Sequence, residues 1–319
     1  MPERALIALV GCTATGKTEV AEFVAAALGG EVVCADSRQV FRELDVGTGK
    51  PSPEQRAARP HHLFEALTVA AYTGQRGAAP HATAGWYARV AAETCAGIHA
   101  RGNTPVLVGG SGLYLRAAQR GLAPTPAIDP ETRARLTREL AAGGAAALHE
   151  RLAGCDPDAA RSIHASDAQR ITRALEVNES TGHSMRWWRE QPSSAAVQGR
   201  WHVFQLGAEP AELRRRIAAR TRWMFDNGLI EETRALIERD MSAALGRLRA
   251  IGYDEALELL AGRSSREAAE ERTDLRTAQL AKRQRTWFRH QVESESLAAD
   301  GRGAAALAAH VVARMHGSG

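Results

Sequence analysis

The sequence lacks the features that mark membrane, secreted and zinc-binding proteins. No apolar run approaches the roughly 18 residues that a membrane-spanning helix needs. The start, MPERALIALVG, has neither the long apolar stretch nor the cleavage site of a signal peptide, so we expect a cytoplasmic protein. The four cysteines form no C-x-x-C pair, which argues against a zinc site or a disulfide framework. His61, His62 and His81 also lack the spacing of zinc ligands on a helix.

Lysine is scarce as well. Of the 41 basic residues, 38 are arginine and only three are lysine, namely Lys17, Lys50 and Lys282. The compact ammonium of lysine and the planar guanidinium of arginine are not interchangeable at a tight phosphate site. We therefore expect lysine where an arginine does not fit, and all three lysines fall in segments that the motifs below also select.

Acidic residues are missing from one basic segment near the C-terminus. The net charge is only +4, but residues 276–289, RTAQLAKRQRTWFR, carry five basic residues and no acidic one. In a helix, Lys282, Arg285 and Arg289 would share one face. A second basic cluster spans residues 214–222. A solvated helix face is the plain interpretation, but the lack of intervening acids favours nucleic-acid binding.

What the chain does contain is an alternation of apolar strands and helices. With 319 residues, 44% of them hydrophobic, it can bury a large core. Strands are predicted at residues 5–11, 31–37, 104–112 and 200–208, with helices at 18–29 and 85–102. Strands that alternate with helices pair in parallel. The sequence thus predicts an α/β fold, with functional residues just beyond the carboxyl ends of the strands.

The clearest motif is GCTATGKT, residues 11–18, which matches G-x-x-x-x-G-K-T between a predicted strand and a predicted helix. This P-loop is also the ATP-binding motif. Its backbone N–H groups favour an anion, Lys17 neutralises the anion and the Thr18 hydroxyl can bind Mg²⁺. The predicted phosphate-binding residues are Gly11, Cys12, Thr13, Ala14, Thr15, Gly16, Lys17 and Thr18. The loop does not choose the reaction, because a triphosphate and a diphosphate ester present the same oxygens.

An acid is missing where a P-loop NTPase usually has one. In those enzymes an apolar strand ends in an acid that helps to hold Mg²⁺. Here the strand PVLV runs into Gly109 and Gly110, and the acid lies after the second strand, at Asp36. Asp36 could bind a metal, cap a turn, or accept a proton or hydrogen bond from a nucleophile.

The middle of the chain has a different texture. Between about Leu115 and Gly199 several helical patterns follow one another, and no strand is apparent. We predict a P-loop-type parallel sheet flanked by helices, formed by residues 1–114 and 200–293, with an all-helical insertion at 115–199 and a C-terminal helical tail at 294–319. No internal repeat or low-complexity block is evident.

An ordered set of motifs runs nearly end to end and resembles the bacterial tRNA dimethylallyltransferase family, also called IPP transferases. A lone P-loop would be weak evidence, but nine blocks in the same order are specific. They are GCTATGKT (11–18), ADSRQVF (35–41), LDVGTGKP (44–51), PHHL (60–63), PVLVGGSGLY (105–114), DAQRITRALEV (167–177), RTRWMFDNGLIEE (220–232), AIGYDE (250–255) and QLAKRQRTWF (279–288).

The resemblance implies a prenyl transfer to the adenosine at position 37 of tRNA, next to the anticodon. Dimethylallyl diphosphate would be the donor, and the P-loop would hold its diphosphate with Mg²⁺ at Thr18. By motif match, Asp36 would hydrogen-bond N6 of the adenine and take its proton. Thr13, Lys17 and Arg220 would stabilise the charge on the departing diphosphate. Ser111 stands where the family usually has threonine and keeps the hydroxyl near the base.

The resemblance also implies a set of tRNA contacts. The target adenine would leave its stack, and the helical insertion would grip the anticodon stem-loop of a tRNA bound by a single protein chain, without any protein partner. Arg170 and Arg173 would share a helix face suited to phosphates, unless Asp167 and Glu176 neutralise them. The matching residues are Asp36, Ser37, Arg38, Gln39, Ser111, Arg133, Gln169, Arg170, Ile171, Thr172, Arg173, Arg249, Gly252, Tyr253, Lys282, Arg283, Gln284 and Arg285.

The chain departs from the family pattern at three places. Cys12 replaces a usual proline, and it is either a thiol activated by the helix N-terminus or simply a small residue. Phe41 replaces a common tyrosine, and residues 73–86 are longer and less familiar than expected.

Three other functions are compatible with part of the pattern. A P-loop kinase or NTPase is supported by the loop alone and opposed by the acid-free third strand. An RNA-binding protein or RNA chaperone with a vestigial loop is opposed by the intact Lys17, Thr18 and Asp36. Prenyl or isopentenyl transfer to free adenine nucleotides is the third, and the basic segments favour tRNA over it.

Overall fold

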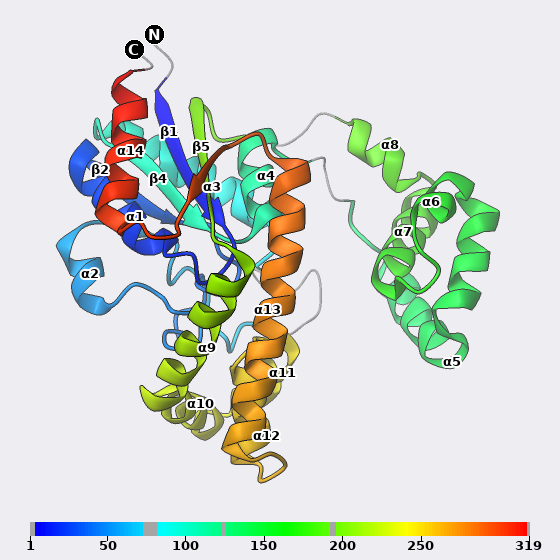
Figure 1. Cartoon of the computed structure of the whole chain (residues 1–319). Helices are drawn as coiled ribbons and strands as arrows, with labels where there is room; N and C mark the ends of the chain where they lie inside the picture. Colours follow the sequence, from blue (N-terminus) through cyan, green and yellow to red (C-terminus); the bar gives the residue numbers. More distant parts are fainter. Residues whose placement is uncertain (1–3, 73–81, 123–125, 192–195, 318–319) are drawn as a thin grey trace. The chain divides into compact units, whose positions relative to one another are not determined.

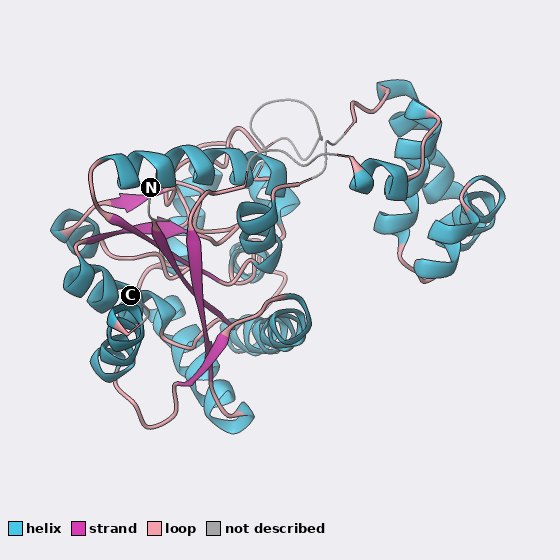
Figure 2. Cartoon of the chain, turned by 90° about the horizontal axis from the view of Figure 1, so that it is seen from above, coloured by secondary structure: helices cyan, strands magenta, loops and turns pink. Residues whose placement is uncertain are grey.

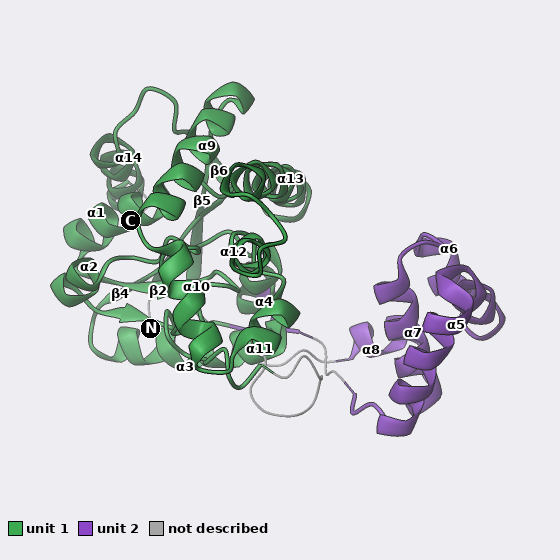
Figure 3. Ribbon diagram, turned by 90° about the horizontal axis from the view of Figure 1, so that it is seen from below, with its two compact units in different colours: residues 1–119, 197–319 green, residues 120–196 purple. Residues whose placement is uncertain are grey.

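The computed structural model describes residues 4–72, 82–122, 126–191 and 196–317, and the chain forms two compact units. Unit 1 comprises residues 1–119 and 197–319, and unit 2 comprises residues 120–196 (Figure 3). The helical insertion predicted at 115–199 is therefore shorter at both ends. Residues 115–119 belong to unit 1 because they are part of helix α4, and residues 197–199 belong to it because they lead directly into strand β5.

Unit 1 is built on a six-stranded, entirely parallel sheet (Figure 1). Its order is β3-β2-β4-β1-β5-β6. The strands are β1 (Ala5–Gly11), β2 (Gly30–Cys34), β3 (His61–His62), β4 (Thr104–Gly109), β5 (Arg200–Gly207) and β6 (Glu295–Ala298). The predicted α/β fold is confirmed. The two strands not predicted, β3 and β6, are the edge strands and are too short to carry a pattern. The predicted helical tail therefore begins with a strand that pairs with β5.

Helices cover both faces of this sheet (Figure 2). They are α1 (Lys17–Leu28), α2 (Pro53–Ala58), α3 (Ala84–Ala100), α4 (Gly112–Arg120), α9 (Pro210–Asp226), α10 (Leu229–Glu238), α11 (Ser242–Leu248), α12 (Tyr253–Leu260), α13 (Arg266–Gln291) and α14 (Ala304–His316). The strands β1, β2 and β4 are largely apolar because both faces are covered, and residues 6–9 of β1 are fully buried. Strand β5 is only partly buried. Helices α9 and α13 pack against each other, and α14 packs on α1.

The described residues of unit 2 form four helices, α5 (Pro130–Cys155), α6 (Pro157–Ser162), α7 (Ala168–Thr181) and α8 (Met185–Glu190). Each begins with a side-chain N-cap, supplied by Asp129, Asp156, Asp167 and Ser184. Leucines of α5 and apolar residues of α7 form a separate small core. Within residues 126–191 no strand occurs, in agreement with the prediction.

Candidate active site at the carboxyl ends of the strands

The P-loop lies between β1 and α1 and has an open row of N–H donors. Gly11 has φ 142°, and a Cβ there would lie 2.2 Å from the carbonyl oxygen of Leu206. Gly16, with φ 82°, is the N-cap of α1. Among the described residues, nothing accepts a hydrogen bond from the backbone N–H groups of residues 14–18. These groups and the N-terminus of α1 therefore form a cradle for an anion.

Lys17 and Thr15 are tied to the loop itself. The ammonium of Lys17 and the hydroxyl of Thr15 both donate to the carbonyl oxygen of Cys12. Enclosure by the protein lowers the pKa of Lys17 to about 8. The negative charge of Asp36 raises this pKa, and the positive charge of Arg220 lowers it further. A cation that is costly to bury without a partner is suited to bind an anionic ligand.

Asp36 and Ser111 lie beyond the ends of the neighbouring strands β2 and β4. The Ser111 hydroxyl oxygen accepts a hydrogen bond of 2.9 Å from the backbone N–H of Ser37. Asp36 Oδ1 accepts one of 2.9 Å from the N–H of Arg38. Since β4 lies between β2 and β1, the sheet order places both residues beside the P-loop.

Arg220 of α9 joins the P-loop to the segment 44–50. Its Nη1 donates to Thr13 Oγ1 at 3.3 Å and its Nη2 donates to the carbonyl oxygen of Thr48 at 2.7 Å. Burial lowers the pKa of Arg220, and the charge of Asp36 opposes this shift. The structure thus brings the five predicted catalytic residues, Asp36, Thr13, Lys17, Ser111 and Arg220, to one edge of the sheet.

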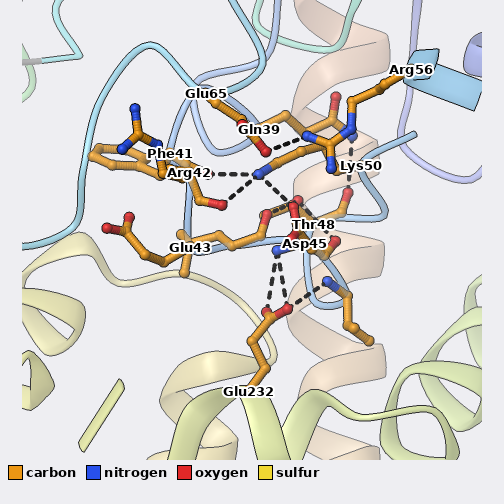
Figure 4. A network of polar contacts seen from close by, with 12 residues as sticks. Gln39, Phe41, Arg42, Glu43, Asp45, Thr48, Lys50, Arg56, Glu65 and Glu232 are labelled. Carbon is orange, nitrogen blue, oxygen red and sulfur yellow. Dashed lines mark hydrogen bonds and ion pairs between the residues drawn. The ribbon is translucent and has the colours of Figure 1, made fainter. Parts of the chain in front are cut away.

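The segment 44–50 is held by a polar network that the sequence reading did not identify (Figure 4). Gln39 donates to the carbonyl oxygens of Thr48 and Gly49, each at 3.1 Å. Lys50 is fully buried at its side chain, binds Asp45 at 2.6 Å and donates to two backbone carbonyl groups. Glu232 of α10 accepts from the N–H groups of residues 45 and 46. In the sequence, the only sign of this network is that its residues 44–50 and 232 lie in the motifs 44–51 and 220–232.

Tyr253, the first residue of α12, completes this network. Its hydroxyl donates to Glu232 and accepts from the N–H of Gly47 at 3.2 Å. Burial raises the pKa of Glu232. Tyr253 is fully buried, and these contacts tie α12 to the loop 44–50. The preceding Gly252 has φ 91°, and its N–H donates to Glu255.

The basic helix predicted near the C-terminus is α13. Lys282 and Arg283 are exposed, and within the described part of the chain neither they nor Arg285 and Arg289 form an ion pair. Their charges are therefore available to an external anion. Gln284, between them, bonds inward instead: Oε1 accepts from the Thr13 N–H at 2.9 Å and Nε2 donates to the carbonyl oxygen of Gly110 at 2.9 Å.

Cys12 packs in the small apolar cluster between α9 and α13. Its side chain contacts Leu213 and Ile217, and its thiol donates to the carbonyl oxygen of Ala281 at 3.3 Å. Burial raises the pKa of the Cys12 thiol. Its buried, apolar surroundings favour the interpretation of Cys12 as a small packing residue. Phe41 is likewise buried, with its ring edge-on to Tyr72.

Two further predicted residues, Arg38 and Arg249, meet at the C-terminal end of α11. Arg38 donates to the carbonyl oxygen of Leu248 at 2.9 Å, which places it beside Arg249 at the end of α11. Arg249 is exposed and has φ 49°. It borders a cleft of about 920 Å³ that is also lined by residues of α10, α12 and α13.

The predicted RNA contacts of unit 2 gather on α5 and α7. Arg133 and Arg173 both bind Glu176, at 3.3 and 3.2 Å, and Arg170 binds Asp167 at 3.5 Å. The pairs of Arg170 and Arg173 are those that the alternative interpretation predicted, and the pair of Arg133 with Glu176 was not predicted. Arg170 is still 75% exposed at its side chain, and Gln169 is exposed beside it. Ile171 lies in the core of the unit, and the buried hydroxyl of Thr172 has no hydrogen-bond partner among the described residues.

The fold and the site define a P-loop-type α/β protein whose anion cradle lies beside the strand end that carries Asp36. The model of the family described as IPP transferase matches residues 39–291, and that described as isopentenyl transferase matches residues 4–60. The chain belongs to the IPP transferase family, which confirms the resemblance seen in the motifs.

Individual relatives agree over nearly the whole length. The chain is 41% identical to a tRNA dimethylallyltransferase of Halorhodospira halophila, over 98% of each chain. It is 42% identical to that of Geobacter sulfurreducens, over 89% of this chain and 88% of the relative. The structure of the full-length tRNA isopentenylpyrophosphate transferase of Bacillus halodurans is similar with a TM-score of 0.69 at 30% identity, covering 99% of this chain and 96% of that one.

Proposed function

We propose that the protein transfers a dimethylallyl group from dimethylallyl diphosphate to N6 of the adenosine at position 37 of tRNA, releasing diphosphate. The observation that carries this assignment is the position of Asp36. Asp36 follows β2, and a complete P-loop follows β1 at the same edge of the sheet. Strand β4, where an NTPase would have its acid, is followed by no acid and runs into Gly109 and Gly110. The phosphate cradle thus faces a proton acceptor.

The residues present support a displacement at carbon. The lone pair of N6 attacks the allylic carbon, the carbon–oxygen bond breaks and its electron pair leaves with the diphosphate. Asp36 accepts the proton from N6. The N–H groups of the P-loop, the ammonium of Lys17 and the guanidinium of Arg220 stabilise the charge on the leaving group. Ser111, held by the Ser37 N–H, orients the adenine.

The residues at the start of α1 also fit Mg²⁺. The Thr18 hydroxyl is half-buried, and nothing in the described part of the chain forms a hydrogen bond with it. Hydroxyl and phosphate oxygens are the hard ligands that Mg²⁺ takes, usually with several waters. Thr18 would hold the ion with the diphosphate, and the ion would neutralise part of the diphosphate charge.

The RNA partner in this proposal is the anticodon stem-loop. The exposed Lys282 and Arg283 supply cations for phosphates, and Arg170 supplies one on unit 2. An adenine in a single-stranded loop leaves its stack at a cost of a few kcal/mol. The protein would act as a monomer in the cytoplasm. Among the described helices, none has both the length and the apolar character to span a bilayer.

The test offers labelled dimethylallyl diphosphate with unmodified tRNA or with free adenine nucleotides, and measures ATP hydrolysis separately. We expect label on tRNA at position 37 and negligible ATP hydrolysis. Label on free nucleotides alone would assign the enzyme to that acceptor class instead. ATP hydrolysis without prenyl transfer would identify a P-loop NTPase.

A further inference from the structure

Gln284 connects three parts of the site that lie far apart in the sequence. It projects from α13, its Oε1 accepts from the backbone N–H of Thr13, and its Nε2 donates to the carbonyl oxygen of Gly110. Both hydrogen bonds are 2.9 Å long. The first partner belongs to the P-loop, and the second precedes Ser111 at the end of β4. One side chain therefore ties the diphosphate cradle to the strand end on the adenine side.

The surroundings leave this amide little freedom. A Cβ on Gly110 would lie 2.4 Å from Gln284 Nε2, and a Cβ on Gly112 would lie 2.1 Å from the ring of Trp287. Gln284 and Trp287 are one turn apart on α13, so the helix packs closely on the glycines that follow β4. An amide supplies both the acceptor and the donor, whereas a carboxylate or an ammonium supplies only one of them.

The bond to Thr13 leaves the anion cradle open. The N–H of Thr13 points to Gln284, whereas those of residues 14–18 have no partner in the described part of the chain. Thr13 is also the residue that Arg220 contacts. Gln284 thus holds the P-loop at Thr13 and leaves the N–H groups of residues 14–18 available to a phosphate.

We propose that Gln284 is a positioning residue that sets the P-loop relative to the end of β4, and thereby the diphosphate relative to the adenine. This inference rests on the proposed prenyl transfer. It replaces the direct RNA contact that the motif match implied for Gln284, and it leaves such contacts to the exposed cations at 282 and 283.

The first test substitutes Gln284 while sparing the helix. Gln284→Met removes both hydrogen bonds, and Gln284→Glu removes the bond to Gly110. Each should raise the KM for dimethylallyl diphosphate and the Kd of the enzyme for inorganic diphosphate with Mg²⁺ by about tenfold, the typical effect of one lost hydrogen bond. The Kd for tRNA without donor should change by less than about twofold. Gln279→Glu, the same change at an exposed position of α13, should leave the KM and the Kd for diphosphate unchanged.

The second test displaces the amide without altering Gln284. Gly110→Ala places a methyl group against Nε2 and should raise the same KM. In a Gln284→Ala background the methyl group finds space, so the double variant should be no worse than either single variant. This comparison does not need the Gln284→Met variant. It uses only Gly110→Ala, Gln284→Ala and the double variant, so it remains informative if Gln284→Met fails to fold.

The outcomes are distinct. Loss of tRNA affinity in Gln284→Met with unchanged diphosphate affinity would make Gln284 an RNA contact and overturn the inference. Additive effects of Gly110→Ala and Gln284→Ala would overturn it as well. If the wild-type protein itself transfers no prenyl group to tRNA, the proposed function fails, and binding of inorganic diphosphate still reports on the link between Gln284 and the loop.

Discussion

Arg220 and Thr13, 207 residues apart in the chain, meet at a distance of 3.3 Å between Nη1 and Oγ1. The same guanidinium reaches the carbonyl oxygen of Thr48 at 2.7 Å. The side chain therefore depends on three separate segments for its position: its own helix α9, the P-loop and the loop 44–50. A Cβ on Gly49 would approach it to 2.7 Å, so this loop passes closely over the guanidinium.

Arg220→Lys tests whether this geometry matters beyond the charge. An ammonium keeps the charge but cannot reach two acceptors with a planar fork. We expect kcat/KM for prenyl transfer to fall by about 100-fold, the usual effect of removing one preorganised donor from a developing anion. Affinity for tRNA should be unchanged. Arg234→Lys on α10, an exposed position, is the control, and equal activity of the two variants would refute the role of Arg220.

Asp36→Ala should abolish transfer while binding of tRNA largely persists. The loss of a positioned base lowers the rate by roughly 10²–10⁴-fold. Asp36→Asn, which keeps the turn formed with Arg38 but cannot accept a proton, should be equally inactive. Single-turnover transfer and tRNA binding are measured in parallel. A comparable loss in both would make Asp36 structural.

The lowered pKa of Lys17 predicts how donor binding depends on pH. Its ordinary value is 10.5 and the protein lowers it to about 8. A diphosphate prefers the ammonium form, so affinity is complete below about pH 8 and falls about tenfold per pH unit above it. Binding of dimethylallyl diphosphate without tRNA measures this. Lys17→Arg should bind more weakly but without this pH dependence. A constant affinity of the wild type from pH 7 to about pH 9.5 would contradict the prediction.

The same shift changes stability in the opposite direction. Between the two pKa values the unfolded chain holds a proton that the folded chain has lost, so the free energy of unfolding rises with pH in this window. Below about pH 8 both states are protonated, and the cost of enclosing the ammonium is fully present. Lys17→Met should remove this dependence.

Much of the fold could be predicted because the inner strands have a strong signal. Buried parallel strands are largely apolar runs, as in β1, β2 and β4, and all three were identified. The fourth inner strand, β5, is only partly buried and was identified as well. The edge strand β3 has two residues and β6 has four, so neither carries a period. Their existence depends on pairing with β2 and β5, which is a tertiary property.

The parts of the site that could be predicted are those in which a residue type at a strand end has one evident chemical role. The P-loop and Asp36 follow from strand ends that the pattern locates. The roles of Gln284 and Tyr253 were not accessible, because the same residues in a basic motif could bind RNA or bond inward. The inward bonds of both side chains depend on the packing of α13 on Gly110 and of α12 on Gly47, which is a tertiary property.

Tyr253→Phe should lower the free energy of unfolding by about 1–3 kcal/mol, because the half-buried Glu232 and the N–H of Gly47 each lose a partner. Affinity for tRNA should be unchanged, since the ring is fully buried. Chemical denaturation and tRNA binding check the two parts. A lower affinity for tRNA at an unchanged free energy of unfolding would instead support the RNA contact that the resemblance implies for Tyr253.

Replacing Lys282, Arg283 and Arg285 by alanine should weaken tRNA binding and flatten its dependence on salt. Each cation that neutralises a phosphate contributes about 0.7–0.9 to the slope of log K against log salt. These three have no ion pair in the described residues, so each is free to contribute, and the slope should fall by about two units. The matched control is Arg266→Ala on the same helix, because Arg266 already binds Asp226 and Glu270. An unchanged slope in the triple variant would show that α13 does not contact the RNA backbone, and the phosphate contacts would then have to come from unit 2.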